Sequence, residues 1–454
     1  MSFEYCDLFA GIGGFHAALD SLGGHCAFAS EIDPAAAAVY ERNWGPGVTR
    51  RDGRPVVEGD IVALTDPSVA DHLPAHDVLV GGFPCQPFSK SGYQRGINET
   101  RGTLFFNIAQ ILRERQPSIV FLENVRNLVG PRHESTWRTI ISTLRSLGYR
   151  VSDTPTVFSP HLLPQECGGS PQVRERVFIL GTYVGVDRAQ AETSIGPVVP
   201  KGPVDGWNPQ AWDLNAILTS QGEVLESGEV VDLEPYALSV AELGWIAVWD
   251  EFVQEYYEAA EGASLPGFPI WADEFRSEPR WTPGMPKWKR DFLQKNSDLY
   301  NRFRHSFIDD WLQRHDHLAA LPPSRRKLEW QAQSTGSLWD TVLHLRPSGI
   351  RAKRPTYVPA LVAMNQTSII GSQRRRITPR EAARLQGLPD WFDFGDQPDA
   401  LTYKQLGNGV AVGAAYHVFR EHVMSDSDVA PHIRDAVAAG PSAPSVRRPL
   451  ASAV

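Results

Sequence analysis

The segment from Gly81 to Ser89 places a cysteine between two prolines. Its sequence is Gly-Gly-Phe-Pro-Cys-Gln-Pro-Phe-Ser, and it directly follows a predicted strand at 77–80. The prolines Pro84 and Pro87 fix the backbone on either side of Cys85, and a rigidly held thiol at the carboxyl end of a strand can act as a nucleophile in a cleft. A buried structural cysteine, the usual fate of this residue type, would not need this framing. We therefore predict that Cys85 is a nucleophile.

The other cysteines, Cys6, Cys26 and Cys167, lack such framing, and we assign them to packing. No CxxC pair occurs in the sequence, so the cysteines offer neither a disulfide framework nor the spacing of a zinc site. The sequence therefore predicts no metal.

A glycine-rich run at 7–15, Asp-Leu-Phe-Ala-Gly-Ile-Gly-Gly-Phe, follows a predicted strand and precedes a predicted helix. Such a turn lets a cofactor approach the backbone, although a plain tight turn would also explain it. The next strand ends at Glu31, about 20 residues downstream, where a carboxylate can accept hydrogen bonds from ribose hydroxyls. A further acidic residue, Asp60, precedes Ile61 and is a candidate to meet an adenine amino group. Together these residues favour an adenosine-containing ligand.

Apolar β-rich runs alternate with helical patterns over the first 185 or so residues, which is typical of a parallel sheet covered by helices. We expect a Rossmann-like α/β sheet with its ligands at the carboxyl ends of the strands. The predicted strands are 5–9, 25–30, 77–81, 119–123, 150–156 and 176–182, and the predicted helices are 14–22, 34–43, 103–115 and 135–147.

The composition divides the chain into four parts. Residues 1–182 form the first part of the sheet domain, and 183–370, rich in Trp, Pro and charge, form a separate and mostly irregular domain. Within the second domain, aromatic residues at 245, 249, 252 and 256 share one helix face and are assigned to core packing. Residues 371–424 return to the first domain. The Ala-, Pro- and Ser-rich tail at 425–454 is predicted to be disordered.

The formal net charge of -9 argues, taken alone, against a protein that coats polyanions. The charge is uneven, however, because 221–275 is acidic whereas basic residues dominate 287–384. This asymmetry permits a basic surface that faces nucleic acid, although ordinary solvated charges would give the same pattern. No apolar stretch is long enough to span a membrane, and no secretory signal is recognisable, so we expect a cytoplasmic protein with no membrane contact.

The nucleophile segment and the glycine turn resemble the DNA cytosine-5 methyltransferases of bacterial restriction-modification systems. Further blocks of that family occur in the same order: Glu123-Asn124-Val125, Gln172 to Arg176, Arg376 to Gly387, and Tyr403 to Val410. The resemblance covers about 185 residues at the front and about 50 near the end. It implies an S-adenosylmethionine-dependent methyltransferase sheet, with a target-recognition domain at 183–370 and double-stranded DNA as the partner.

The resemblance assigns catalytic roles that the chemistry explains. Thiolate attack by Cys85 on C6 of a flipped-out cytosine makes C5 nucleophilic. Protonation of N3 by Glu123, a carboxyl group expected to have a raised pKa, eases this addition. Arg174 and Arg176 are expected to hold Glu123 and to donate to the cytosine O2. The resemblance also places four residues against the base: Pro84, Gln86, Ser89 and Asn124.

For S-adenosylmethionine, the resemblance implies contacts along the front of the sheet and from the carboxyl-terminal blocks. Phe9 is expected on the adenine and Glu31 on the ribose, while Ile32 stands where some relatives carry a large aromatic side chain. The full set of expected cofactor residues is Asp7, Phe9, Gly11, Gly13, Glu31, Ile32, Asp60, Ile61, Asn408 and Val410.

Alternatives remain at this stage. A relative that methylates transfer RNA would keep the same chemistry, but a separate region of about 190 residues favours recognition of a short duplex sequence. A catalytically silent DNA-binding regulator would not need all four catalytic residues, and a small-molecule methyltransferase would not need the proline-framed cysteine. We expect a monomer that is paired in function, without direct contact, with a restriction endonuclease.

Overall fold

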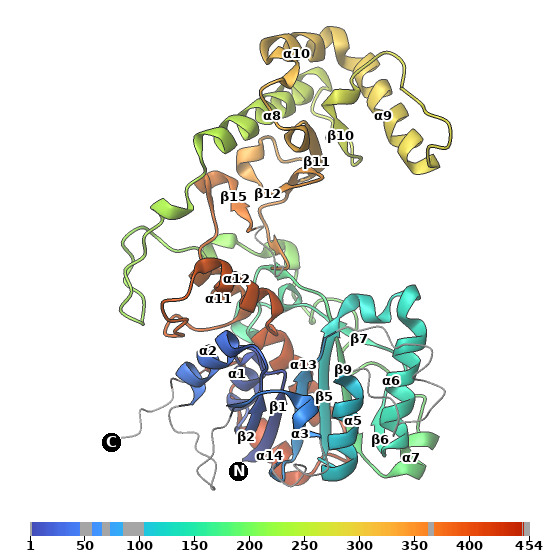
Figure 1. Cartoon of the computed structure of the whole chain (residues 1–454), viewed down its shortest axis with the longest axis vertical. Helices are drawn as coiled ribbons and strands as arrows, with labels where there is room; N and C mark the ends of the chain where they lie inside the picture. The colour runs from blue at the N-terminus through green and yellow to red at the C-terminus, as the bar shows by residue number, and fades with distance from the viewer. Residues whose placement is uncertain are drawn as a thin grey trace.

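Figure 1 shows the computed structural model, in which a large sheet domain carries both chain ends and a smaller lobe lies at the opposite end of the molecule. The structure describes residues 2–45, 57–65, 73–84, 104–361, 367–446 and 448. Cys85, Gln86 and Ser89 lie outside the described residues.

The first sheet has eight strands in the order β3-β2-β1-β4-β5-β9-β6, and β7 pairs with β9. The strands from β3 to β5 are parallel, whereas β9 runs antiparallel to both β5 and β6. The chain order reverses between β1 and β4, which is the point where open α/β sheets bind their ligands. The bounds are β1 (Phe3–Leu8), β2 (Gly24–Ser30), β3 (Val57–Glu58), β4 (Val78–Gly82), β5 (Ile119–Val125), β6 (Tyr149–Val151), β7 (Thr156–Phe158) and β9 (Arg176–Tyr183).

Helices cover both faces of this sheet (Figure 1). Alternate residues of β1 show why: Phe3 and Tyr5 pack with α1, α2 and α13, while Cys6 and Leu8 pack with α5 and α6. Burial on both faces is typical of parallel sheets. None of the helices in the described part is long and apolar enough to cross a membrane. The bounds are α1 (Gly14–Asp20), α2 (Pro34–Trp44), α3 (Ile61–Leu64), α5 (Leu104–Arg115), α6 (Glu134–Ser146), α7 (Val186–Ala191) and α13 (Val412–Ser425).

The predicted strands and helices of this domain are confirmed, with ends that differ by one or two residues. One prediction is wrong: 150–156 is not a single strand. Asp153 and its neighbours form a bend between β6 and β7, and each of these short strands pairs separately with β9.

The carboxyl-terminal segment completes the first domain through α11 (Pro379–Gln386), α12 (Asp399–Asn408), α13 and α14 (Pro431–Ala439). The predicted disorder from residue 425 onwards is wrong for α14, because Ile433 and Val437 are buried in the core that α13 also joins. These two apolar residues are four apart and therefore lie on one face of the helix. The Ala- and Ser-rich composition of the segment favoured a prediction of disorder, and the spacing of these two residues was not considered.

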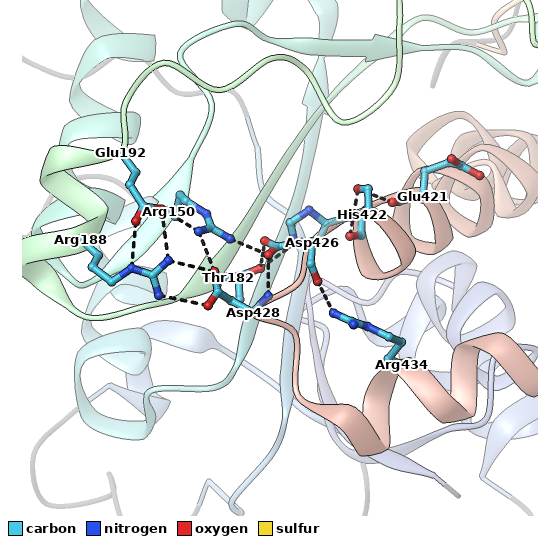
Figure 2. A network of polar contacts seen from close by, with 10 residues as sticks. Arg150, Thr182, Arg188, Glu192, Glu421, His422, Asp426, Asp428 and Arg434 are labelled. Atoms are coloured by element: carbon cyan, nitrogen blue, oxygen red, sulfur yellow. Dashed lines mark hydrogen bonds and ion pairs between the residues drawn. The ribbon is translucent and has the colours of Figure 1, made fainter.

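A polar network fastens the end of α13 to the edge of the sheet (Figure 2). Arg150 of β6 pairs with Asp426 at 2.5 Å, and Thr182 of β9 donates to the other carboxylate oxygen of Asp426 at 2.7 Å. Arg150 also pairs with Asp428, which Arg188 of α7 contacts from the other side. The side chains of Arg150 and Asp426 are largely buried, so this pair ties distant parts of the chain together.

The smaller lobe contains a six-stranded sheet in the order β10-β11-β13-β12-β15-β16. The composition of this part of the chain had predicted mostly irregular structure instead. Trp249, Phe252 and Tyr256 of α8 are buried in its core and Trp245 packs against them, so the aromatic stripe is confirmed as core packing. The bounds are α8 (Val240–Ala259), α9 (Lys287–Phe303), α10 (Asp309–Arg314), β10 (Ile270–Trp271), β11 (Lys327–Gln331), β12 (Val342–Arg346), β13 (Gly349–Lys353), β15 (Ile369–Ile370) and β16 (Arg375–Arg376).

Candidate active site

A cavity of about 340 Å³ opens at the carboxyl ends of β1, β2, β4 and β5, beside the end of α12. It brings together residues that the sequence predicts for two different roles. Phe9, Gly11, Glu31 and Asn408 come from the predicted cofactor set, and Pro84, Glu123, Asn124 and Arg176 come from the predicted catalytic and substrate set. The arrangement therefore places a cofactor region next to a catalytic carboxyl group.

The two glycines of the turn after β1 have different roles. Both have left-handed backbones, with φ of 57° at Gly11 and 92° at Gly13. A Cβ on Gly11 would meet no atom within 4 Å, so the backbone there is open to the cavity. A Cβ on Gly13 would lie 2.0 Å from Nε1 of Trp44, whose indole donates to the carbonyl of Ile12 at 3.0 Å. Gly11 thus suits approach by a ligand, whereas Gly13 makes room for a tryptophan.

Glu31 is held at the cavity wall by two backbone amides. The amide of Gly11 donates to Oε2 at 2.8 Å, and that of Asp33 donates to Oε1 at 2.7 Å. Each carboxylate oxygen keeps a lone pair that can accept from a ligand hydroxyl. Ile32 does not join this wall, because 67% of its surface is exposed and it does not line the cavity.

Asp7 lies beneath the turn rather than in the cavity. It is fully buried, and neither carboxylate oxygen has a hydrogen-bond partner among the described residues. Burial, reinforced by the charge of Glu31, raises the pKa of Asp7 well above its usual value. Asp7 does not line the cavity, so its expected contact with the cofactor stays a prediction.

Three more residues of the predicted cofactor set are not in the cavity lining. Asp60 caps α3 by accepting from the amide of Val62 at 2.9 Å, and Ile61 is buried in the core beneath that helix. The carbonyl of Val410 packs close against Gly14 at the start of α1. Val410 therefore contacts the start of α1, and its side chain lies close to Gly82 of β4.

Glu123 is the carboxyl group at the catalytic side of the cavity. It is 7% exposed and accepts from Nε of Arg176 at 2.9 Å. Burial raises the pKa of Glu123, while the charges of Arg176 and Arg174 oppose that shift. Gly82 of β4 pairs in register with Glu123 of β5, so the segment that leads to Cys85 starts beside this carboxyl group. A protonated carboxyl group in this position can act as a general acid.

Arg174 does not bond to Glu123, contrary to the expectation that both arginines hold this carboxyl group. It is 1% exposed and donates to three backbone carbonyls. These are the carbonyls of Leu361 at 3.2 Å, Gly407 at 2.9 Å and Gly409 at 2.5 Å. Arg174 therefore joins the chain leaving the smaller lobe to the two glycines that flank Asn408.

Asn124 positions the chain just before the nucleophile segment. Its Nδ2 donates to the carbonyl of Phe83 at 2.8 Å, and its Oδ1 accepts from the amide of Val125 at 2.8 Å. The side chain is buried, and these contacts use it for the protein backbone. Because Cys85 follows two residues after Phe83, Asn124 fixes the start of that segment, while Cys85 itself lies outside the described residues.

Sequence reasoning missed Lys404 and the role of Trp44. Lys404 lines the cavity and pairs with Asp33 at 3.3 Å. It lies four residues before Asn408 in α12, so helical spacing places both on one face and could have revealed it. Trp44 has no comparable signal, because its contact with the glycine turn depends on how α2 packs.

The strand order and the cavity at the switch point define a Rossmann-like α/β protein that binds its ligands at the carboxyl ends of the parallel strands. Residues 3–424 match the model of the C-5 cytosine-specific DNA methylase family, and the chain belongs to this family. It is a DNA cytosine-5 methyltransferase.

Individual relatives agree with this assignment. The Type II methyltransferase M.AluI of Cellulosimicrobium cellulans is 45% identical over 500 aligned positions, which cover 93% of this chain and 92% of the relative. M.BanI of Aneurinibacillus aneurinilyticus is 28% identical over 93% of this chain and 96% of its own. M.HhaI of Haemophilus parahaemolyticus is 40% identical over a shorter match, 39% of this chain and 48% of its own. The similarity to M.AluI therefore extends through both lobes.

Proposed function

We propose that this enzyme methylates C5 of a flipped-out cytosine in one short, specific sequence of double-stranded DNA. The observation that carries the proposal is the buried Glu123–Arg176 pair, which shares a cavity with Gly11 and Glu31. A general acid and a cofactor wall so close together suit transfer between two ligands bound side by side.

The cavity wall fits S-adenosylmethionine. Gly11 leaves open space where the methionine portion would lie, Glu31 offers lone pairs to the ribose hydroxyls, and Phe9 provides an apolar surface for the adenine. Asn408 closes the wall from α12. S-adenosylmethionine, when bound here, supplies the methyl group to which the electron pair at C5 forms its new bond.

Three residues carry the chemistry on the cytosine. The thiolate of Cys85 forms a bond to C6, and N3 takes a proton from Glu123 as the ring electrons shift. Arg176 donates to O2 and keeps Glu123 in place. After methylation the C5 proton passes to water. The bond from C6 to sulfur then breaks, Cys85 leaves as a thiolate, and N3 returns its proton to Glu123. Arg174 acts as a positioning residue, because its donors are used by backbone carbonyls.

Catalysis and recognition of the DNA sequence are assigned to different parts of the chain. We assign catalysis to 1–182 together with 371–424, and recognition of the DNA sequence to 183–370. The name of M.AluI as a Type II methyltransferase supports a role in restriction-modification. In that role the enzyme acts as a monomer in the cytoplasm and protects host DNA from a restriction endonuclease that it need not contact.

Methylation mapping tests the proposal. The full chain is incubated with S-adenosylmethionine and mixed-sequence duplex DNA, and 5-methylcytosine is located by bisulfite-type sequencing, with transfer RNA in a parallel reaction. We expect methylation of one short duplex motif by the wild-type chain and none by the Cys85→Ala variant, which should still bind DNA. Methylation of transfer RNA alone would overturn the proposal.

A further inference from the structure

One face of the six-stranded sheet of the smaller lobe is covered by helices. The opposite face, called the open face below, is only partly exposed, because Val342 and His344 on it are buried. Leu328, Trp330, Leu343 and Ile350 all point to the side where α8 and α10 pack. Residues between them in the strands point the other way, because successive side chains of a strand alternate between faces. We define the open face by six of these residues: Glu329, Gln331, His344, Arg346, Arg351 and Lys353.

The strand register brings the charged residues of the open face together. His344 pairs with Arg351 across β12 and β13, and Glu329 pairs with Arg351 across β11 and β13. The face carries three cations and one carboxylate, on a chain whose net charge is -9. A local excess of positive charge on an acidic protein indicates an anionic partner.

Only one of the three cations is neutralised within the described structure. Arg351 pairs with Glu329 at 2.5 Å. Arg346 and Lys353 have no ion-pair partner among the described residues, and the buried Nε of Arg346 has no hydrogen-bond partner there. Burial and the charge of Arg351 lower the pKa of both Arg346 and Lys353. These two cations thus repel their neighbours in the free protein, and a bound anion would relieve that repulsion.

The open face is also joined to the active site. Val342 and Ile370, on the same side of the sheet as Lys353, belong to the core of the catalytic domain. Leu361, whose carbonyl accepts from Arg174, follows Lys353 by eight residues, which span at most roughly 29 Å. One turn of duplex DNA is about 34 Å long. Lys353 therefore lies within the length of one turn of duplex DNA from Leu361.

We propose that Arg346 and Lys353 bind backbone phosphates of the duplex that flank the target cytosine. This inference rests on the proposed function, because it takes duplex DNA as the occupant. The two cations contribute affinity that does not depend on base sequence. Arg351, already held by Glu329, keeps their strands in register.

The test is the salt dependence of DNA binding by the full chain. The probes are a duplex that contains the mapped methylation motif and a duplex that lacks it. Arg346→Gln and Lys353→Gln are compared with Lys289→Gln, which removes an exposed cation of α9 in the same lobe. Binding of S-adenosylmethionine by each variant serves as the control for folding.

We expect each of the two face variants to weaken binding to both duplexes about equally and to reduce the slope of log K against log salt by about 1. Lys289→Gln should keep the wild-type slope. A wild-type slope in both face variants, or a loss confined to the motif-bearing duplex, would overturn the inference. A wild-type chain that methylates no duplex DNA would instead refute the proposed function.

Discussion

Arg174→Met should weaken cofactor binding although Arg174 lies behind the cavity wall. The change keeps an unbranched side chain of similar reach and removes the donors to Leu361, Gly407 and Gly409. A hydrogen bond from a charged group contributes about 1.5 to 3 kcal/mol, and bonds from one side chain are not additive, so we expect a loss of about 3 kcal/mol. If half or more of this free energy is lost from the bound position of the segment around Asn408, the Kd for S-adenosylmethionine rises about 10- to 100-fold.

Arg380→Met is the matched control. Arg380 is also buried and donates to two backbone carbonyls, those of Pro389 at 3.2 Å and Phe392 at 2.8 Å, but neither of these residues lines the cavity. Calorimetric titration gives the Kd and denaturant unfolding gives the stability. Arg380→Met should lose a similar amount of stability and keep the wild-type Kd. An unchanged Kd in Arg174→Met, with both variants destabilised, would refute the positioning role.

Three further predictions concern catalysis and stability. Glu123→Gln should lower kcat by about 10²- to 10⁴-fold. Because Glu123 acts in its protonated form and its pKa is raised, wild-type activity should fall as pH rises through this pKa. The pH profile of the variant should lack this fall. Gly13→Ala should lower the free energy of unfolding by at least about 2 kcal/mol, because its Cβ would overlap Trp44; an unchanged denaturation midpoint would contradict this. Arg150→Met should lower the free energy of unfolding by about 3 kcal/mol at neutral pH, because it leaves the largely buried Asp426 without this cation. Burial raises the pKa of Asp426, but its hydrogen bonds, including that from Arg150, outweigh burial and lower the pKa overall. The loss of stability in Arg150→Met should therefore shrink as pH falls through the pKa of Asp426, because the protonated carboxyl group no longer attracts Arg150.

The first sheet could be predicted from sequence because its strands are continuous apolar runs. Ile119–Val125 and Arg176–Tyr183 are buried on both faces, so hydrophobicity alone identifies them. The second sheet escaped prediction because its strands are two to five residues long and pair across long separations. Strand β11 at 327–331, for example, pairs in parallel with β13 at 349–353. Nothing local in so short a strand indicates its partner.

The site also has residues that could be predicted from the sequence and residues that could not. Glu31 and Glu123 stand at the ends of predicted strands, and the structure places both in one cavity. The role of Arg174 could not be predicted, because its acceptors are backbone carbonyls, which no residue type reveals. The positions of Asp7 and Asp60 likewise could not be predicted. Asp7 is buried within β1 and the carboxylate of Asp60 caps α3, and a motif does not fix the direction of either carboxyl group.

The central claim is that Cys85 attacks C6 of the cytosine that is methylated. A duplex with 5-fluorocytosine at the mapped position tests it most directly, because fluorine at C5 cannot leave as a proton does and the attacked base stays bound to the nucleophile. With S-adenosylmethionine present, we predict a covalent complex whose base carries one added methyl group, with the crosslinked peptide containing Cys85. A chain that methylates ordinary cytosine but forms no such complex, or forms it at another residue, would contradict the account.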